Sequence, residues 1–232
     1  MSLAKRPNLS GFMLGCRKAK HREVFIMRKM YTELVFVLDR SGSMAGLESD
    51  TIGGFNGMLK KQREEEGEAT VTTVLFDDKY ELLHDRIPMA GVEPMTEKQY
   101  YVRGCTALLD AVGKTICKIK AVLQNTAESM RAEKVIFVII TDGCENASRE
   151  FGYRQIKGLI EQQKEQGWEF LFLGANMDAV AEAKQMGIQA DRAVMYACDA
   201  EGTQLNYRVV NEAVCRMRRA EAPVGAEWKK GD

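Results

Sequence analysis

One stretch of the chain, residues 33–44 (Glu-Leu-Val-Phe-Val-Leu-Asp-Arg-Ser-Gly-Ser-Met), restricts the fold more than any other. Its five consecutive apolar residues, Leu34 to Leu38, predict a strand buried on both faces, as in a parallel sheet covered by helices. The apolar run ends at Asp39, and hydroxyl side chains follow at Ser41 and Ser43. In extended backbone this spacing of two directs all three side chains to one side. A carboxylate and two hydroxyls there suit a hard cation such as Mg²⁺, although an acidic strand end followed by a Ser/Gly turn also explains them.

Strands and helices alternate along the rest of the chain, which predicts an α/β fold with a mostly parallel sheet and helices on both faces. Further strands are expected at residues 69–76, 80–87, 134–140, 168–173 and 192–196. The strand at 80–87 returns antiparallel after a hairpin turn at Asp77 and Asp78, a turn that needs no functional explanation. Helices are expected at 51–66, from the segment 103–112 to about 127, and at 150–166, 177–186 and 203–219.

The first predicted helix has two features that need a structural explanation. Ser49 or Asp50 can cap its N-terminus. Gly53, Gly54 and Gly57 fall on neighbouring positions inside it, where each glycine costs about 1 kcal/mol relative to alanine. We expect close approach of this helix to the sheet, or to the loop at Ser41 and Ser43, to offset that cost.

Charge is unevenly distributed between the expected parts of the chain. Residues 1–29 carry eight Lys/Arg and one Glu, and we expect a flexible basic tail there, a domain over residues 30–220, and a flexible tail over 221–232. Because the whole chain holds 33 basic and 33 acidic side chains, residues 30–232 hold 25 and 32, a net charge of −7. An acidic body argues against nucleic acid as the partner. The basic tail could alternatively serve as a docking arm for an acidic surface.

The six cysteines show no Cys-x-x-Cys pair and no histidine at zinc-site spacing, so we interpret them as reduced thiols of a cytoplasmic protein. No apolar run approaches the ~20 residues of a membrane span. Met13 to Cys16 faintly resembles a lipoprotein signal, but its apolar segment is short and basic residues follow at once. Cys105 and Cys144 are interpreted as small residues that fill a crowded loop, with a redox pair as the alternative.

Two further oxygen-bearing residues follow the same logic as Asp39. Asp142 directly follows the predicted strand 134–140 in the sequence Thr-Asp-Gly, and Thr106 lies in Gly-Cys-Thr-Ala-Leu-Leu-Asp-Ala at the start of a predicted helix. Ligands of open α/β sheets bind at the carboxyl ends of the strands. The sequence therefore predicts that three separate segments bring together one set of side chains: Asp39, Ser41, Ser43, Thr106 and Asp142.

This set resembles the metal-ion-dependent adhesion site (MIDAS) of von Willebrand factor A (vWA) domains, above all stand-alone prokaryotic or phage-type ones. The family signature is Asp-x-Ser-x-Ser on the first strand–helix loop, a distant Thr, and an Asp ending a later strand, and residues 39–43, Thr106 and Asp142 match it. The resemblance implies a Rossmann-like six-stranded sheet with one antiparallel edge strand. It also implies a divalent cation, usually Mg²⁺ with Mn²⁺ or Ca²⁺ as alternatives, bound by the hydroxyls, with one or both Asp acting through water. Another protein would then supply a carboxylate to an open coordination position.

Enzymatic alternatives have weaker support in the sequence. Phosphoryl-transfer sites of the Asp-x-Asp type need a second carboxylate at position 41, where this chain has serine. Residues 113–115 (Gly-Lys-Thr) resemble the end of a phosphate-binding loop, but the earlier glycine is missing and the stretch lies inside a predicted helix. His21 and His84 belong to no catalytic motif. A metal-dependent hydrolase and an accessory subunit of an ATPase machine remain the alternative functions.

Asn176 follows a predicted strand, and we interpret it as a helix cap rather than as a ligand.

Overall fold

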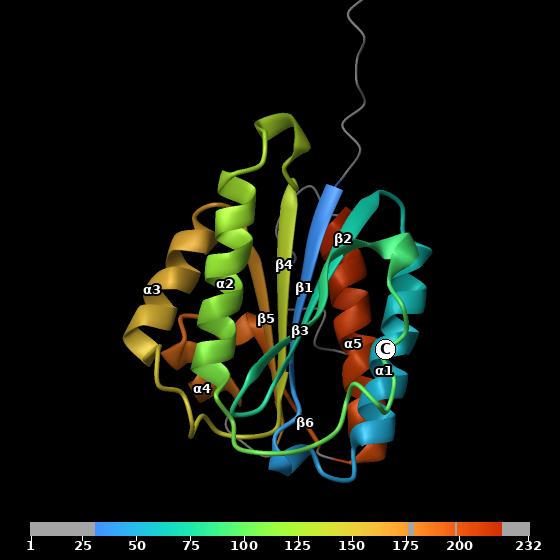
Figure 1. Ribbon diagram of the computed structural model, residues 1–232, viewed down its shortest axis with the longest axis vertical. Coiled ribbons are helices and arrows are strands. Elements are labelled where there is room, and N and C mark those ends of the chain that lie inside the picture. Colours follow the sequence, from blue (N-terminus) through green and yellow to red (C-terminus); the bar gives the residue numbers. More distant parts are fainter. Residues whose placement is uncertain (1–30, 176–178, 198, 220–232) are drawn as a thin grey trace, which may run out of the picture.

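The computed structural model describes residues 31–175, 179–197 and 199–219 of the chain (Figure 1). The two predicted tails and Asn176 lie outside these residues. The described residues form one six-stranded sheet in the order β3-β2-β1-β4-β5-β6, in which only the β2–β3 pair is antiparallel. The predicted α/β architecture with an antiparallel edge strand is thus confirmed. The strands are β1 (Tyr31–Asp39), β2 (Glu68–Phe76), β3 (Tyr80–Pro88), β4 (Lys134–Thr141), β5 (Glu169–Ala175) and β6 (Ala193–Tyr196).

Helices cover both faces of the sheet, which makes a three-layer structure (Figure 1). One face carries α1 (Glu48–Arg63) and α5 (Ala200–Arg219), and the other carries α2 (Leu108–Gln124), α3 (Tyr153–Lys164) and α4 (Ala179–Gln185). Alternate residues of β1 enter two separate cores. Leu34 and Phe36 pack in the core with α1 and α5, whereas Val35 and Val37 pack in the core with α2 and α3. A strand in the middle of such a sheet has no solvent-facing side, which explains the unbroken apolar run.

Three predicted helix starts are wrong by three residues. Helix α5 begins at Ala200 instead of about residue 203. Helix α1 begins at Glu48, after Leu47, so Ser49 and Asp50 lie inside its first turn and neither caps it. The Leu47 carbonyl accepts the Thr51 N–H in the first helical hydrogen bond, and the Leu47 side chain is buried. Helix α3 begins at Tyr153 instead of about residue 150, because the N–H groups of residues 149–151 all donate to the Asp110 carboxylate.

The glycines of α1 are predicted to bring the helix close to the sheet or to the Ser41–Ser43 loop, and this prediction is wrong. A Cβ added at Gly54 would lie 2.3 Å from Cδ2 of Tyr207, so the close approach is between α1 and α5. A Cβ added at Gly53 or Gly57 would meet no atom within 4 Å. Only one of the three glycines is therefore explained by packing within the described chain. None of the helices that the structure describes is long and apolar enough to span a membrane.

Candidate metal centre

Three segments meet at the carboxyl edge of the sheet and bring the predicted site residues together. Strand β1 ends at Asp39, and β4, its parallel neighbour, ends at Thr141, directly before Asp142. The loop after β1 continues into a short 3₁₀ turn, Gly42–Met44, and Thr106 lies two residues before α2. The Gly42 N–H donates to the Gly104 carbonyl at 3.2 Å, which ties the first loop to the Thr106 segment.

A chain of hydroxyl contacts connects four of the five predicted residues. The Thr106 hydroxyl donates to Ser41 Oγ at 3.0 Å, and Ser41 Oγ lies 3.1 Å from Ser43 Oγ. The Ser43 hydroxyl in turn donates to Oδ1 of Asp142. The fifth residue, Asp39, joins through backbone, since its Oδ1 accepts the Ser41 N–H at 2.6 Å. All five side chains thus lie in one cluster, of which only Ser43 is exposed.

The Asp39 carboxyl is buried near a second acid, Asp142, and both conditions disfavour its ionised form. Burial raises its pKa to about 6, and the nearby charge of Asp142 acts in the same direction. Hydrogen bonds from the Thr141 hydroxyl, at 2.6 Å, and from Ser41 lower the pKa but do not compensate. A cation bound beside Asp39 would favour the ionised form of the carboxyl.

The backbone of Gly143 lies against the three hydroxyls of the site, with no side chain between them. A Cβ added at this glycine would lie 2.7 Å from Thr106 Oγ1, 3.0 Å from Ser43 Oγ and 3.6 Å from Ser41 Oγ. The hydroxyl oxygens are hydrogen-bonded to one another at 3.0 and 3.1 Å. The edge of a Mg²⁺ octahedron is about 3.0 Å for Mg–O bonds of about 2.1 Å, so the same oxygens would reach an ion with little change in their spacing. The described residues contain no cluster of three or more His, Cys, Asp or Glu suited to a metal. Hydroxyl and carboxylate oxygens therefore dominate this site, and they fit a small, hard cation.

Several residues that support the site were missed by the sequence analysis. The Asn146 side chain accepts the Thr106 N–H at 2.9 Å, and the Asn146 N–H donates back to the Thr106 carbonyl at 3.0 Å. Glu145 accepts the Leu109 N–H at 2.9 Å in the first turn of α2. These contacts fix Thr106 against the loop after Asp142. Thr141 and Gly143, which also contact the site, lie within the Thr-Asp-Gly sequence already singled out, but no sequence pattern marks Glu145 or Asn146.

A second buried cluster, centred on Asp77, holds the first loop and the Thr106 segment together. The fully buried Arg40 donates from Nε to Asp77 Oδ2 at 2.9 Å, and Arg103 donates to the same oxygen at 2.7 Å. The Asp77 carbonyl also accepts the Ala107 N–H at 2.9 Å. Asp78 is exposed in the turn, as predicted. For Asp77, however, the turn prediction missed a structural role beside the site.

Other sequence hypotheses near the site have clear outcomes. Cys105 and Cys144 are exposed and free, so their interpretation as filling of a crowded loop is wrong. Residues 113–115 lie inside α2, and the Lys114 ammonium pairs with Glu150 at 2.7 Å, so they form no phosphate-binding loop. His84 is buried and shares a hydrogen bond of 3.0 Å with Thr73.

Comparisons with known proteins give the fold a name. No protein-family model and no curated protein matches the sequence. Among solved structures, the chain is similar to the vWF domain of the pilus tip protein Mfa5 from Porphyromonas gingivalis, with 11% identity, a TM-score of 0.58, and coverage of 84% of this chain and 99% of that one. It is also similar to proximal thread matrix protein 1 from the mussel byssus with a zinc-occupied MIDAS motif, with 15% identity, a TM-score of 0.54, and coverage of 81% of this chain and 46% of that one. A third similar structure is the ArnB paralog VWA2 from Sulfolobus acidocaldarius, with 17% identity, a TM-score of 0.51, and coverage of 78% of this chain and 44% of that one.

The chain spans less than half the length of the mussel and Sulfolobus chains. Identities of 11–17% carry information on the fold alone. The architecture and the three neighbours agree: this chain has the fold of the von Willebrand factor A domain.

Proposed function

We propose that this chain is a divalent-cation-binding interaction module, without catalytic activity, that captures a carboxylate of a partner protein. Asp39, Ser41, Ser43, Thr106 and Asp142 would hold the cation. The observation that carries this proposal is the convergence of three hydroxyls and two carboxyls in one cluster beside Gly143. The zinc-occupied MIDAS motif of the mussel protein supports a divalent cation at this edge of the fold.

We propose Mg²⁺ as the cation, because hydroxyl and carboxylate oxygens suit a small, hard ion. Ca²⁺, which takes six to eight oxygens at about 2.3–2.6 Å, is also accommodated by hydroxyl oxygens 3.0 and 3.1 Å apart. Mn²⁺ belongs with Mg²⁺ among the metals that suit oxygen ligands, so it is the natural substitute. Neither alternative changes the residues that would hold the ion.

The open side of the cluster indicates where a partner would bind. Ser43 is exposed, whereas Asp39, Ser41 and Thr106 are buried, so access is from the side of Ser43. Three ligands are neutral hydroxyls, and a bound cation would therefore keep positive charge available to an incoming Asp or Glu. Neighbours described as matrix and pilus proteins support a binding role.

Four free cysteines among the described residues support a reducing, cytoplasmic setting.

Calorimetric titration with Mg²⁺ and with Mn²⁺ tests the metal site. Thr106→Val keeps the shape of the side chain but removes its hydroxyl oxygen, and we expect it to weaken binding about tenfold or more. The matched control is Thr126→Val, because Thr126 donates to the Val122 carbonyl at 2.7 Å beyond the end of α2. The control should bind like the wild type. Equal affinities of the Thr106 variant and the wild type would refute the proposed site.

Two further assays separate a binding module from an enzyme. Proteins captured from a lysate by the immobilised chain should be released by EDTA, and Asp39→Ala should capture none of them. Retention in EDTA would contradict a cation bridge. Phosphatase and nuclease assays with Mn²⁺ should show no turnover, and turnover that disappears in Asp39→Ala would instead establish the metal-dependent hydrolase.

A further inference from the structure

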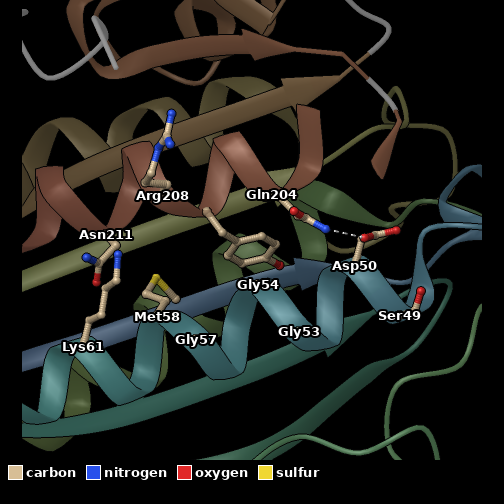
Figure 2. Close-up of a pocket in the computed structure, with 11 residues that line it drawn as sticks. Ser49, Asp50, Gly53, Gly54, Gly57, Met58, Lys61, Gln204, Arg208 and Asn211 are labelled. Atoms are coloured by element: carbon tan, nitrogen blue, oxygen red, sulfur yellow. Dashed lines mark hydrogen bonds between the residues drawn. The ribbon is translucent and has the colours of Figure 1, made fainter. Parts of the chain in front are cut away.

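A groove lies between α1 and α5 (Figure 2). These two helices cover the face of the sheet opposite α2 and α3 (Figure 1). Its cavity volume is about 400 Å³. Asp50, Gly53, Gly57 and Lys61 of α1 form one wall, and α5 contributes the other wall, including Arg208 (Figure 2). None of the five predicted metal-site residues lines this groove. It is therefore a separate surface of the molecule.

The glycines on the α1 wall have no explanation within the described chain. Gly53 and Gly57 lie one helical turn apart and are exposed, and a Cβ at either position would meet no atom within 4 Å. Glycine destabilises an exposed helix position relative to alanine. At Gly54 the ring of Tyr207 accounts for the missing side chain, but at Gly53 and Gly57 nothing does. Absent side chains on an exposed face allow the backbone of a second helix to approach closely.

The floor of the groove supplies an apolar contact surface and one unsatisfied polar group. Met58 and Tyr207 line it, and only 2% and 3% of their surfaces are exposed. The Tyr207 hydroxyl is buried and has no hydrogen-bond partner among the residues that the structure describes. Buried hydroxyls normally have a partner. The groove thus combines open backbone, an apolar floor and a polar group that has no partner in the described part of the chain.

The charges of α1 are arranged symmetrically about these glycines. The first turn carries Glu48 and Asp50, and the last turn carries Lys60, Lys61 and Arg63. Gly53 and Gly57 are equally distant from Phe55, which lies at the middle of this 16-residue helix. If two copies of α1 pack antiparallel about that midpoint, Gly53 of each faces Gly57 of the other, and each acidic end meets a basic end. Antiparallel packing also opposes the two helix dipoles, whereas parallel packing would place acid against acid.

We propose that the α1–α5 groove is the interface of a two-fold symmetric dimer, in which α1 of a second copy of this chain lies antiparallel to α1. In this register Asp50 of each copy lies opposite Lys60 and beside Lys61 of the other, and the exposed glycines form the close contact at the two-fold axis. Lys61, like Asp50, lines the groove. An isologous contact of this kind uses one patch twice, so a single self-complementary helix face suffices. Dimer formation would make the molecule bivalent.

Sedimentation velocity over a range of protein concentrations tests the glycine contact. The wild type should shift from monomer to dimer as concentration rises from about 1 to about 300 μM. Gly57→Leu should weaken the association at least tenfold with an unchanged or higher thermal midpoint, because the monomer has space for the side chain. The matched control is Gly158→Leu in α3, another position at which an added Cβ meets nothing within 4 Å. A monomeric wild type, or a Gly57→Leu variant that dimerises normally, would overturn the proposal.

Charge reversal tests the antiparallel register independently. Asp50→Lys alone places two lysines together at both ends of the contact, and Lys61→Glu alone places two acids together, so each variant should remain monomeric. In an equimolar mixture, Lys at 50 of one chain meets Glu at 61 of the other, and Lys61 of the first meets Asp50 of the second. The mixture should therefore form a heterodimer at the wild-type concentration. Failure of the mixture to associate would exclude the antiparallel pairing.

Discussion

Asp39 and Asp77 are both fully buried aspartates at the carboxyl edge of the sheet, yet their surroundings are opposite. Asp77 lies between the guanidinium groups of Arg40 and Arg103. Burial opposes its ionisation, but hydrogen bonds from Arg103 and from the Lys79 N–H, with the charge of Arg40, outweigh burial and hold the pKa of Asp77 below its usual value. Asp39 receives its hydrogen bonds from neutral groups, Thr141 and Ser41, and its pKa is raised to about 6.

The difference separates a structural carboxylate from one that is suited to an added ion. Asp77 has its countercharge within the chain and uses it to fasten three loops. The carboxyl of Asp39 is bonded to neutral donors and faces a second acid, Asp142, across a group of hydroxyls. A divalent cation would supply the missing charge. The following predictions test whether the two sites differ in this way.

Asp77→Ala should give the largest effect. Among the described residues, it leaves the fully buried Arg40 with Glu81, whose side chain is 44% exposed, as its one acidic partner. Removing one member of a buried ion pair costs about 3–5 kcal/mol, so we expect a loss of this size in the free energy of unfolding by urea. The control is Asp85→Ala, since the Asp85–Lys118 pair is on the surface, and it should cost at most about 1 kcal/mol. Equal losses in the two variants would show that the Asp77 cluster is not structural.

The metal-free protein should lose stability as the pH rises through the pKa of Asp39. The folded-state pKa is about 6 and the unfolded value is near 3.8, so the folded state holds the proton more tightly. The proton bound to Asp39 therefore stabilises the folded state fully below the unfolded-state pKa, and this stabilisation is lost as the pH rises to about 7. In EDTA, the free energy of unfolding of the wild type should therefore fall by about 2 kcal/mol between about pH 4 and 7. This fall is measured relative to the Asp39→Asn variant, whose side chain at this position does not titrate. A constant difference between the two proteins would contradict the raised pKa.

How far these two sites could be foreseen depended on their chemistry. The apolar run before Asp39 and the spacing of Ser41 and Ser43 are local, so the sequence predicts the strand, its edge and this part of the oxygen cluster. Thr106 and Asp142 lie 65 and 99 residues from their hydroxyl partners, and they are predicted from the ends of strands in α/β sheets and from the family motif. The contacts of Asp77 are with Arg40 and Arg103, 37 and 26 residues away in the chain. The sequence Asp-Asp-Lys alone does not indicate partners at that distance, and a turn is its simplest interpretation.

The helix starts failed for a related reason. Asp110 looks like an ordinary first-turn acid of α2. Only the folded chain shows that it accepts three N–H groups from residues 149–151 and delays the start of α3. Likewise, the three glycines of α1 look equivalent in the sequence, and only Tyr207 of α5 distinguishes Gly54 from the other two. Tertiary contacts between distant elements decided each of these details.

Gly143→Ala should weaken Mg²⁺ binding without harming the Asp77 cluster. The added methyl would lie 2.7 Å from Thr106 Oγ1 and 3.0 Å from Ser43 Oγ, so the hydroxyls must move apart. Such overpacking costs about 1–3 kcal/mol, which corresponds to a loss in affinity of about 5- to 150-fold by calorimetry. Gly158→Ala, at an exposed position without close neighbours, is the control and should bind normally. Full affinity in Gly143→Ala would mean that the ion binds elsewhere.

Proton competition at Asp39 should give the smallest effect, a modest pH dependence of Mg²⁺ affinity. A proton and a cation favour opposite states of this carboxyl, so binding must displace the proton from the fraction of molecules that hold it. With a pKa of about 6, the ionised fraction falls about fourfold from about pH 7 to about 5.5, and the dissociation constant should rise by the same factor. Calorimetry in two buffers of different ionisation enthalpy would also report the released proton. In Asp39→Asn the weaker residual affinity should vary little over this range, whereas an equal pH dependence in both proteins would assign the proton to another group.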